Sequence, residues 1–140
     1  MRIVIDTNVV IQGVFFGSAP RRILSAVVNR ELEAVASPEI VDEYQEIVDE
    51  MIDRKQGKLD RTILTPFLSK LELIEPTSEI EVCRDPDDDK FISCAVDGKA
   101  IVIVSGDKDL LVIGKYEDVV IMTAYDFCKK HLGGRARCIT

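Results

Sequence analysis

Two strongly apolar runs, far apart in the chain, each lead into a carboxylate. The run 2–5 is followed directly by Asp6, and the run 100–104 leads into Asp107 after a Ser-Gly pair. Continuous β-branched runs of this kind predict strands buried on both faces, as in the parallel sheet of an α/β protein. In such sheets the ligand site lies outside the carboxyl ends of the strands, where the strand order reverses. The pattern therefore predicts that Asp6 and Asp107 lie at a functional site.

The 140 residues and the net charge of −7 are those of one ordinary soluble domain. The net negative charge argues against a protein that wraps duplex DNA, because such binding needs clustered Lys and Arg. No apolar run approaches the ~20 residues of a membrane span, and the chain opens on a core strand instead of a signal peptide. The four cysteines show no CxxC or Cys/His spacing. We expect a cytoplasmic protein with its domain at 1–132 and a mobile tail at 133–140.

Strand and helix patterns alternate along the chain, which predicts a single α/β domain without linker or repeat. Ser37 and Pro38 form a helix start, because serine is a good N-cap and proline fits the first helical turn. In chain order, the expected elements are strand 2–5, a helix containing 23–28, strand 33–36, helix 38–54, helix 61–70, edge strand 71–74, a helix opened by 85–86 and ended by Gly98, strand 100–104, strand 119–122 and helix 125–131.

Asp6 and Glu43 each allow two interpretations. An acid directly after a strand either caps the next helix or binds a ligand, and Asn8 adds a polar group to the same turn. Glu43 borders the apolar stripe of helix 38–54, where it either extends toward solvent or reaches the end of the first strand. Glu43 gains a functional role only if its helix lies over Asp6.

The acidic run 85–89 is partly explained by helix capping and by the helix dipole, which favours acids in a first turn. These effects account for Asp85 and Asp87. Helical spacing places Asp89 three residues before Ile92, toward the packed face, where the dipole does not account for an acid. After strand 100–104, one of Asp107 and Asp109 is expected to cap a short helix, and the spacing does not decide which.

A convergence of aspartate and glutamate without histidine or cysteine predicts a hard-oxygen cation site. Mg²⁺ or Mn²⁺ suits such ligands, and the expected use is phosphate-ester chemistry. The single histidine, His131, lies near the C-terminus without a nucleophile context, and no P-loop or dinucleotide glycine pattern is present.

Four segments together resemble the PIN-domain family of metal-dependent ribonucleases, namely 5–8, 37–44, 84–95 and 104–111. They occur in the family's order, and the resemblance extends from residue 1 to about 130. It is closest to the small single-domain prokaryotic branch described as toxins of toxin–antitoxin pairs. The resemblance implies a three-layer α/β/α sandwich with a central parallel sheet. It also implies hydrolysis of single-stranded RNA by a metal-activated water, with Mg²⁺ or Mn²⁺ as cofactor.

The resemblance also implies roles for individual residues and partners. The residues carried over are Asp6, Glu43, Asp89 and Asp107 as the catalytic, metal-holding quartet, Asp109 as an auxiliary acid, Asn8 and Ser105 as supporting groups, and Asp88 as the alternative to Asp89. Family members of this branch often form homodimers and pair with an antitoxin. Arg21 and Arg22 are candidate RNA contacts, although each is also explained as a solubilising surface charge.

Two other functions fit the same residues. A non-catalytic protein- or RNA-binding module would have a degenerate acidic pocket without affinity for Mn²⁺. A metal-dependent phosphatase would use the same carboxylates on small phosphate monoesters.

Overall fold

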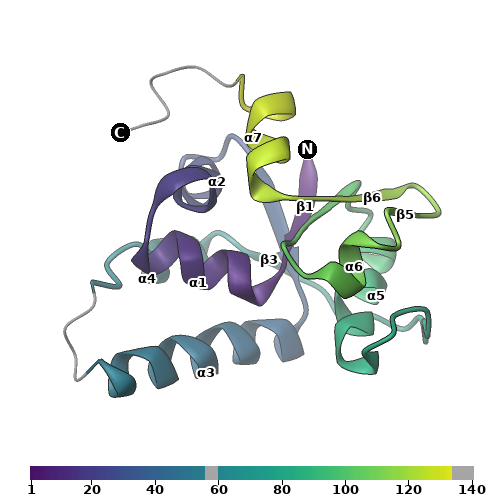
Figure 1. Cartoon of the computed structure of the whole chain (residues 1–140), viewed down its shortest axis with the longest axis horizontal. Helices are drawn as coiled ribbons and strands as arrows, with labels where there is room; N and C mark the ends of the chain where they lie inside the picture. Colours follow the sequence, from purple (N-terminus) through teal and green to yellow (C-terminus); the bar gives the residue numbers. More distant parts are fainter. Residues whose placement is uncertain (56–59, 134–140) are drawn as a thin grey trace.

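The sheet of this protein is nearly all parallel (Figure 1). We describe a computed structural model that covers residues 1–55 and 60–133, and these contain one six-stranded sheet in the order β3-β2-β1-β4-β6-β5. The strands are β1 (Arg2–Ile5), β2 (Glu33–Ala36), β3 (Glu72–Leu73), β4 (Val102–Val104), β5 (Lys115–Tyr116) and β6 (Val119–Met122). Only β5 runs antiparallel, paired with β6. The strand order reverses between β1 and β4, so the switch point of the sheet lies between these two strands.

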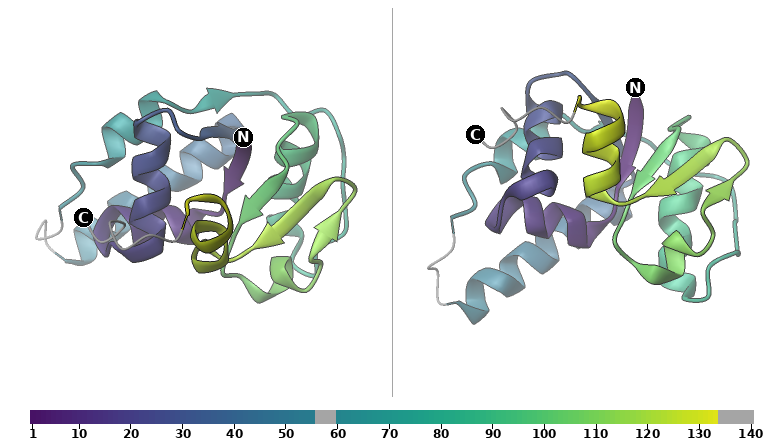
Figure 2. Two further views of the ribbon diagram at one scale, coloured as in Figure 1. Left: turned by 90° about the horizontal axis from the view of Figure 1, so that it is seen from above. Right: turned by 45° about the horizontal axis from the view of Figure 1, so that its top comes forward.

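Helices cover the sheet on two sides. They are α1 (Thr7–Phe15), α2 (Ser18–Val28), α3 (Pro38–Arg54), α4 (Leu64–Ser69), the 3₁₀ turn η1 (Pro86–Asp88), α5 (Asp89–Asp97), α6 (Lys108–Leu111) and α7 (Ala124–His131). The helices α1, α2 and α7 pack together, whereas α5 packs against β1 and β4. Figure 2 shows α2 and α7 on one side of the sheet and α5 on the other. The α/β/α arrangement expected from the sequence is confirmed.

The core holds β1 and β4 rigidly where they end. Ile3, Val4 and Ile5 of β1 and Ile103 and Val104 of β4 are at most 1% exposed. Ile5 stands in register with Val104, so the residues that follow the two strands start side by side. Burial on both faces is what the continuous apolar runs predict.

Most expected elements are present, with two additions. The N-cap at Ser37 is confirmed by a 3.2 Å hydrogen bond from the Ile40 backbone N–H to the Ser37 hydroxyl. The additions are β5 and α1, which begins directly after Asp6. Gly13 lets α1 and α2 approach closely, because a Cβ there would lie 2.7 Å from the Leu24 side chain. From residue 134 on, the predicted tail lies outside the described residues.

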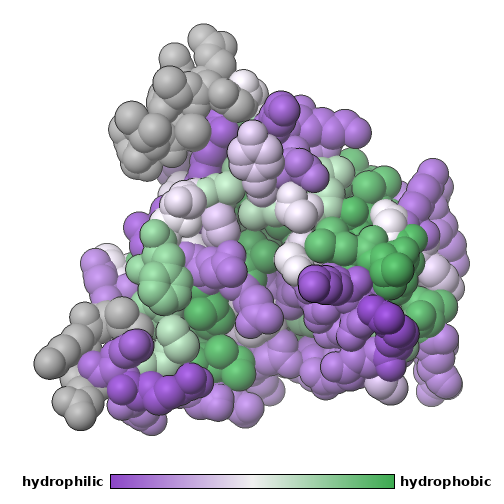
Figure 3. All heavy atoms as spheres, in the orientation of Figure 1, coloured by the Kyte–Doolittle hydropathy of each residue, from purple (hydrophilic) through white to green (hydrophobic). Residues whose placement is uncertain are grey.

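The described helices are all too short or too polar to cross a membrane. Figure 3 shows hydrophobic side chains gathered over α6 and β5, where Val112 is 68% exposed, and hydrophilic ones along α3.

Candidate active site

The ends of β1 and β4 bring Asp6, Ser105 and Asp107 together. The Asp6 backbone N–H donates to the Val104 carbonyl at 2.9 Å, which extends the pairing of the strands by one residue. The buried Ser105 hydroxyl donates to Asp6 Oδ2 at 2.6 Å and accepts from the Asp107 backbone N–H at 2.9 Å. Ser105 therefore connects the two acids that the sequence places at the strand ends.

Asp6 is 5% exposed, and its environment disfavours the charged form. Burial raises the pKa of Asp6 above its ordinary value, the Ser105 hydrogen bond opposes this, and the Asp107 charge adds to it. Asp6 stands at the N-cap of α1 without a capping hydrogen bond of good geometry, although the Asn8 backbone N–H favours its charged form. Helix capping therefore does not account for this buried acid.

Glu43 reaches the same edge from α3. The Tyr44 hydroxyl donates to the Ile5 carbonyl at 2.5 Å, which holds α3 against the end of β1. One carboxylate oxygen of Glu43 accepts from the Thr7 hydroxyl, and the other lies 2.8 Å from the Lys90 ammonium. The condition for a functional Glu43 is met, because its helix does lie at the end of β1.

Within the acidic run, the side chains of Asp85 and Asp89 bind the local backbone. Asp85 caps η1 by accepting from the Asp87 backbone N–H at 3.0 Å. Asp89 Oδ1 accepts from the backbone N–H groups of Val82 and Cys83 at 3.0 and 2.9 Å, and these bonds outweigh burial and lower its pKa. The Asp89 carboxylate thus fixes the loop before η1.

Asp88 differs from its neighbours because it is 8% exposed. Among the described residues, its Oδ2 atom is buried without a hydrogen-bond partner. Burial, followed by the charge of Asp107 and a hydrogen bond with it, raises the pKa of Asp88 to about 7. A buried, unpaired carboxylate oxygen is costly to a fold and calls for a bound partner.

One of Asp107 and Asp109 is expected from the sequence to cap the short helix after β4. Asp107 caps α6 by accepting from the Asp109 backbone N–H at 2.8 Å. Asp109 pairs with the exposed Arg84 at 2.7 Å. Carboxylate oxygens of Asp85, Asp88 and Asp109 all lie within 4.8 Å of one another. Together with the unpaired oxygen of Asp88, this all-oxygen donor set fits a hard divalent cation such as Mg²⁺ or Mn²⁺.

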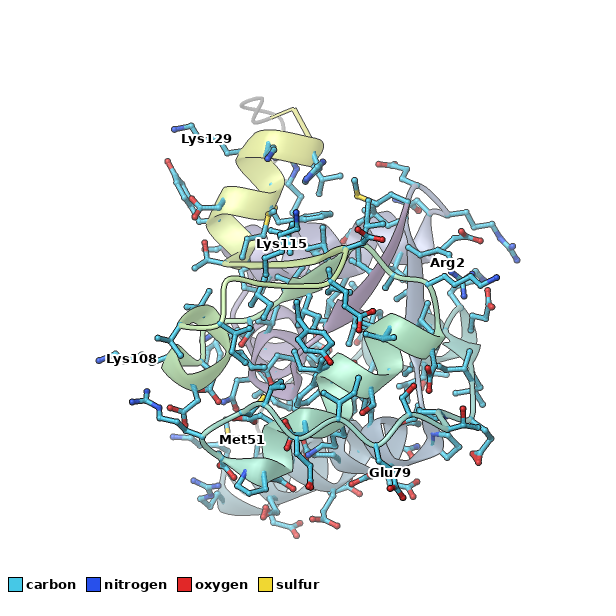
Figure 4. All side chains as sticks on the ribbon, turned by 90° about the vertical axis from the view of Figure 1, so that its right-hand side faces the viewer. Arg2, Met51, Glu79, Lys108, Lys115 and Lys129 are labelled. Carbon is cyan, nitrogen blue, oxygen red and sulfur yellow. The ribbon has the colours of Figure 1, made fainter. Side chains whose placement is uncertain are left out.

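The predicted RNA contacts Arg21 and Arg22 bind backbone carbonyls, whereas the predicted supporting residue Asn8 lies beside Asp107. Arg21 donates to the carbonyls of Gly13 and Val14, and Arg22 donates to the Leu132 carbonyl, so both guanidinium groups hold helix ends. Asn8 is exposed and lines an open hollow of about 580 Å³ beside Asp107, together with Val9, Ile11, Gln12, Gly106 and Ala124. Lys108 points outward from α6 (Figure 4).

Sequence reasoning missed Thr7, Arg84 and Lys90, which contact the predicted acids. Thr7 and Lys90 belong to segments that the resemblance quotes, but their spacing carries no signal of a contact with Glu43. Only the packing of α1 and α5 against α3 creates these contacts.

The fold and the strand-end carboxylates define a class of small α/β proteins with an acidic centre at the switch point of the sheet. A model of the PIN-domain family matches residues 2–109, and the chain belongs to this family. The resemblance found in the sequence is thereby confirmed. PIN domains are generally nucleases, so membership supports nuclease as the class of this protein.

Two known proteins are similar to this chain. An uncharacterized protein of Methanocaldococcus jannaschii is 36% identical over 115 residues, which cover 79% of this chain and 74% of that relative. A crystal structure of VapBC2 from Rickettsia felis contains a chain of similar fold. In that structure VapBC2 is bound to a DNA fragment from its promoter. The TM-score is 0.57 at 18% identity, with 86% of this chain and 97% of that chain covered, so this likeness shows the fold alone.

Proposed function

We propose that this protein is a divalent-metal-dependent endoribonuclease that hydrolyses phosphodiester bonds in single-stranded RNA. The observation that carries the proposal is the buried Asp88 carboxylate near Asp6 and Asp107, whose Oδ2 has no hydrogen-bond partner among the described residues. Three acids in a common environment repel one another, and a bound cation relieves this repulsion. Family membership supports the nuclease class.

The residues that would hold Mg²⁺ or Mn²⁺ are Asp6, Asp88 and Asp107. Glu43 borders them, as do Asp85 and Asp109, whose carboxylate oxygens lie within 4.8 Å of Asp88. When bound, the cation activates water and stabilises negative charge on the phosphoryl group. We propose Asp88 for the third acid instead of Asp89, since the hydrogen bonds of Asp89 are made with the loop at Val82 and Cys83.

The remaining residues of the site orient these acids. Ser105 fixes Asp6 through its hydroxyl and Asp107 through that residue's backbone N–H. The hollow beside Asp107 and Asn8 offers room for a neighbouring nucleotide. Arg84, exposed beside Asp109, is the cation we propose for a phosphate of the RNA strand.

The proposed biological role is that of a toxin in a cytoplasmic toxin–antitoxin pair, acting as a homodimer. The fold likeness to a chain of VapBC2 supports an antitoxin as partner. Co-expression of this chain with the product of a neighbouring gene, followed by co-purification and growth measurement, tests this role.

Cleavage of single-stranded RNA with Mn²⁺ or Mg²⁺ tests the activity. We expect the wild type to cleave and EDTA to stop it, Asp6→Asn and Asp88→Asn to be inactive, and Asp89→Asn to remain active. Asp89→Asn is the matched control, because it removes the same charge one residue away. Loss with Asp89→Asn alone would reverse our assignment of the third acid. A wild type that hydrolyses only a nucleotide monoester would be a phosphatase, and one that binds no Mn²⁺ would be a binding module.

A further inference from the structure

Lys90 carries a nearly buried positive charge beside the acidic site. Its side chain is only 8% exposed. The ammonium group contacts three acceptors, which are Glu43 Oε1 at 2.8 Å, the Asp87 carbonyl at 2.8 Å and Asp87 Oδ2 at 3.0 Å. An ammonium group has three N–H donors, so each donor has an acceptor. Burial disfavours the charge, but the hydrogen bonds to Glu43 and Asp87 outweigh it and raise the pKa of Lys90.

Glu43 is therefore held from two sides. Thr7, on the first turn of α1, donates to one carboxylate oxygen, while Lys90, on the first turn of α5, contacts the other. The Glu43 charge is already neutralised by a group of the same chain. By contrast, Asp88 has an oxygen without a partner among the described residues. The two acids thus differ in what they offer to a cation.

We propose that Lys90 is a positioning residue for Glu43, an internal cation that neutralises this carboxylate and leaves divalent-cation binding to Asp6, Asp88 and Asp107. This inference rests on the proposed function. A partly buried carboxylate that loses a cationic partner attracts another cation. Removal of the Lys90 charge therefore frees Glu43 as an additional ligand and strengthens divalent-cation binding.

The test is a Mn²⁺ titration of the RNA-free protein, followed by the electron paramagnetic resonance signal of free Mn²⁺. We expect Lys90→Gln to bind Mn²⁺ at least about fivefold more tightly than the wild type, because Glu43 loses its ammonium partner and becomes free to act as an additional ligand. Lys90→Arg keeps the charge and is expected to retain wild-type affinity. Lys130→Gln, at an exposed lysine of α7, is the matched control for net charge. Circular dichroism checks each fold, and Lys90→Met replaces the Gln variant if that variant unfolds.

A double variant separates action through Glu43 from a direct effect on the ion. In the Glu43→Gln background the Glu43 carboxylate is absent, and the other acid released from Lys90 is the exposed Asp87, so we expect Lys90→Gln to change the Mn²⁺ affinity little. An equal gain in both backgrounds would overturn the positioning role. Unchanged or weaker binding by Lys90→Gln, relative to Lys130→Gln, would overturn it as well. Failure of the wild type to bind Mn²⁺ would be a different result, since it would overturn the proposed function together with this inference.

Discussion

Acids near the two ends of the parallel strands differ in their partners and in the direction of their pKa shifts. At the amino ends, Arg2 binds both oxygens of Glu72 at 2.7 and 2.9 Å and donates to the Gly98 carbonyl at 2.8 Å. The Arg2 hydrogen bond lowers the pKa of Glu72. At the carboxyl ends, Asp88 retains an unpaired oxygen among the described residues, and burial and Asp107 raise its pKa to about 7. Figure 4 shows Arg2 and Lys108 on different sides of the molecule.

This contrast separates structural acids from functional ones. An acid that serves the fold has a partner in the same chain, as Glu72 has in Arg2 and Asp97 has in Ser78. The acid with which our proposal of a cation site begins differs from these, because Asp88 keeps one oxygen without a partner among the described residues, at some cost in stability. Each of the following experiments breaks or sharpens this contrast.

The largest effect is expected for removal of the carboxylate of Asp6 or Asp88. Asp6→Asn and Asp88→Asn should each lower the rate of RNA cleavage by at least about 100-fold, because metal-dependent chemistry needs both carboxylates. The folded structure should persist, since neither carboxylate supports the core. Cleavage rates with Mn²⁺ and thermal unfolding give the two readouts. Retained activity in either variant would show that its carboxylate is dispensable.

The second effect is a pH dependence of the stability of the metal-free protein, caused by Asp88. Asp88 ionises with a pKa of about 7 when folded and at an ordinary, lower pKa when unfolded, so the folded state binds more protons between pH 4 and pH 7. The contribution of Asp88 to stability is therefore fully present at low pH and is lost as the pH rises to about 7. We expect a loss of about 1–2 kcal/mol, reduced by water at the open site.

Asp88→Asn provides the comparison for this pH effect. The variant should be more stable than the wild type at pH 7.5 and equally stable near pH 4, as measured by urea unfolding in EDTA. Parallel stability profiles of the two proteins would mean that Asp88 does not titrate in this range.

A smaller effect is expected for the acid next to Asp88. Asp89→Ala leaves the backbone N–H groups of Val82 and Cys83 without their acceptor and should cost about 1 kcal/mol of stability. The measurement is urea unfolding, combined with the cleavage rate of the folded enzyme. A cleavage rate as low as that of Asp88→Asn would contradict the structural role of Asp89.

The smallest effect is expected at the amino ends of the strands. Glu72→Gln removes an exposed ion pair, and such pairs contribute little. The melting temperature should change less than with Asp89→Ala, and RNA cleavage should not change. Salt provides a control, because added salt should reduce any stability difference between Glu72→Gln and the wild type.

Strand-end acids were predictable because the pattern that predicts buried parallel strands also predicts where they end. The fold class, the positions of Asp6 and Asp107, and the N-cap at Ser37 followed from local sequence. The helix α1 did not, because its run 9–14 is mostly apolar and rich in β-branched residues, which is equally typical of a strand. It is helical because it is buried between α2 and α3.

Which acid of the run 85–89 is buried depends on a change of helix type. From the sequence, a continuous α-helix from 85–86 onward is expected to place Asp89 on the packed face. In the structure Pro86–Asp88 form a 3₁₀ turn, and the α-helix begins only at Asp89. A 3₁₀ turn has three residues per turn instead of 3.6, so it rotates the preceding side chains relative to an α-helical register. Asp88 is consequently the buried acid, which no helical spacing rule indicates.

The hydrogen bond between Ser105 and Asp6 joins residues 99 positions apart in the sequence. The end of β1 therefore cannot form this hydrogen bond until β4 has been synthesised. A nascent chain that ends before β4 contains Asp6, Glu43 and Asp88 but lacks both Ser105 and Asp107. A product truncated in this way carries an incomplete centre, so the earlier acids acquire their full arrangement only once β4 has been synthesised.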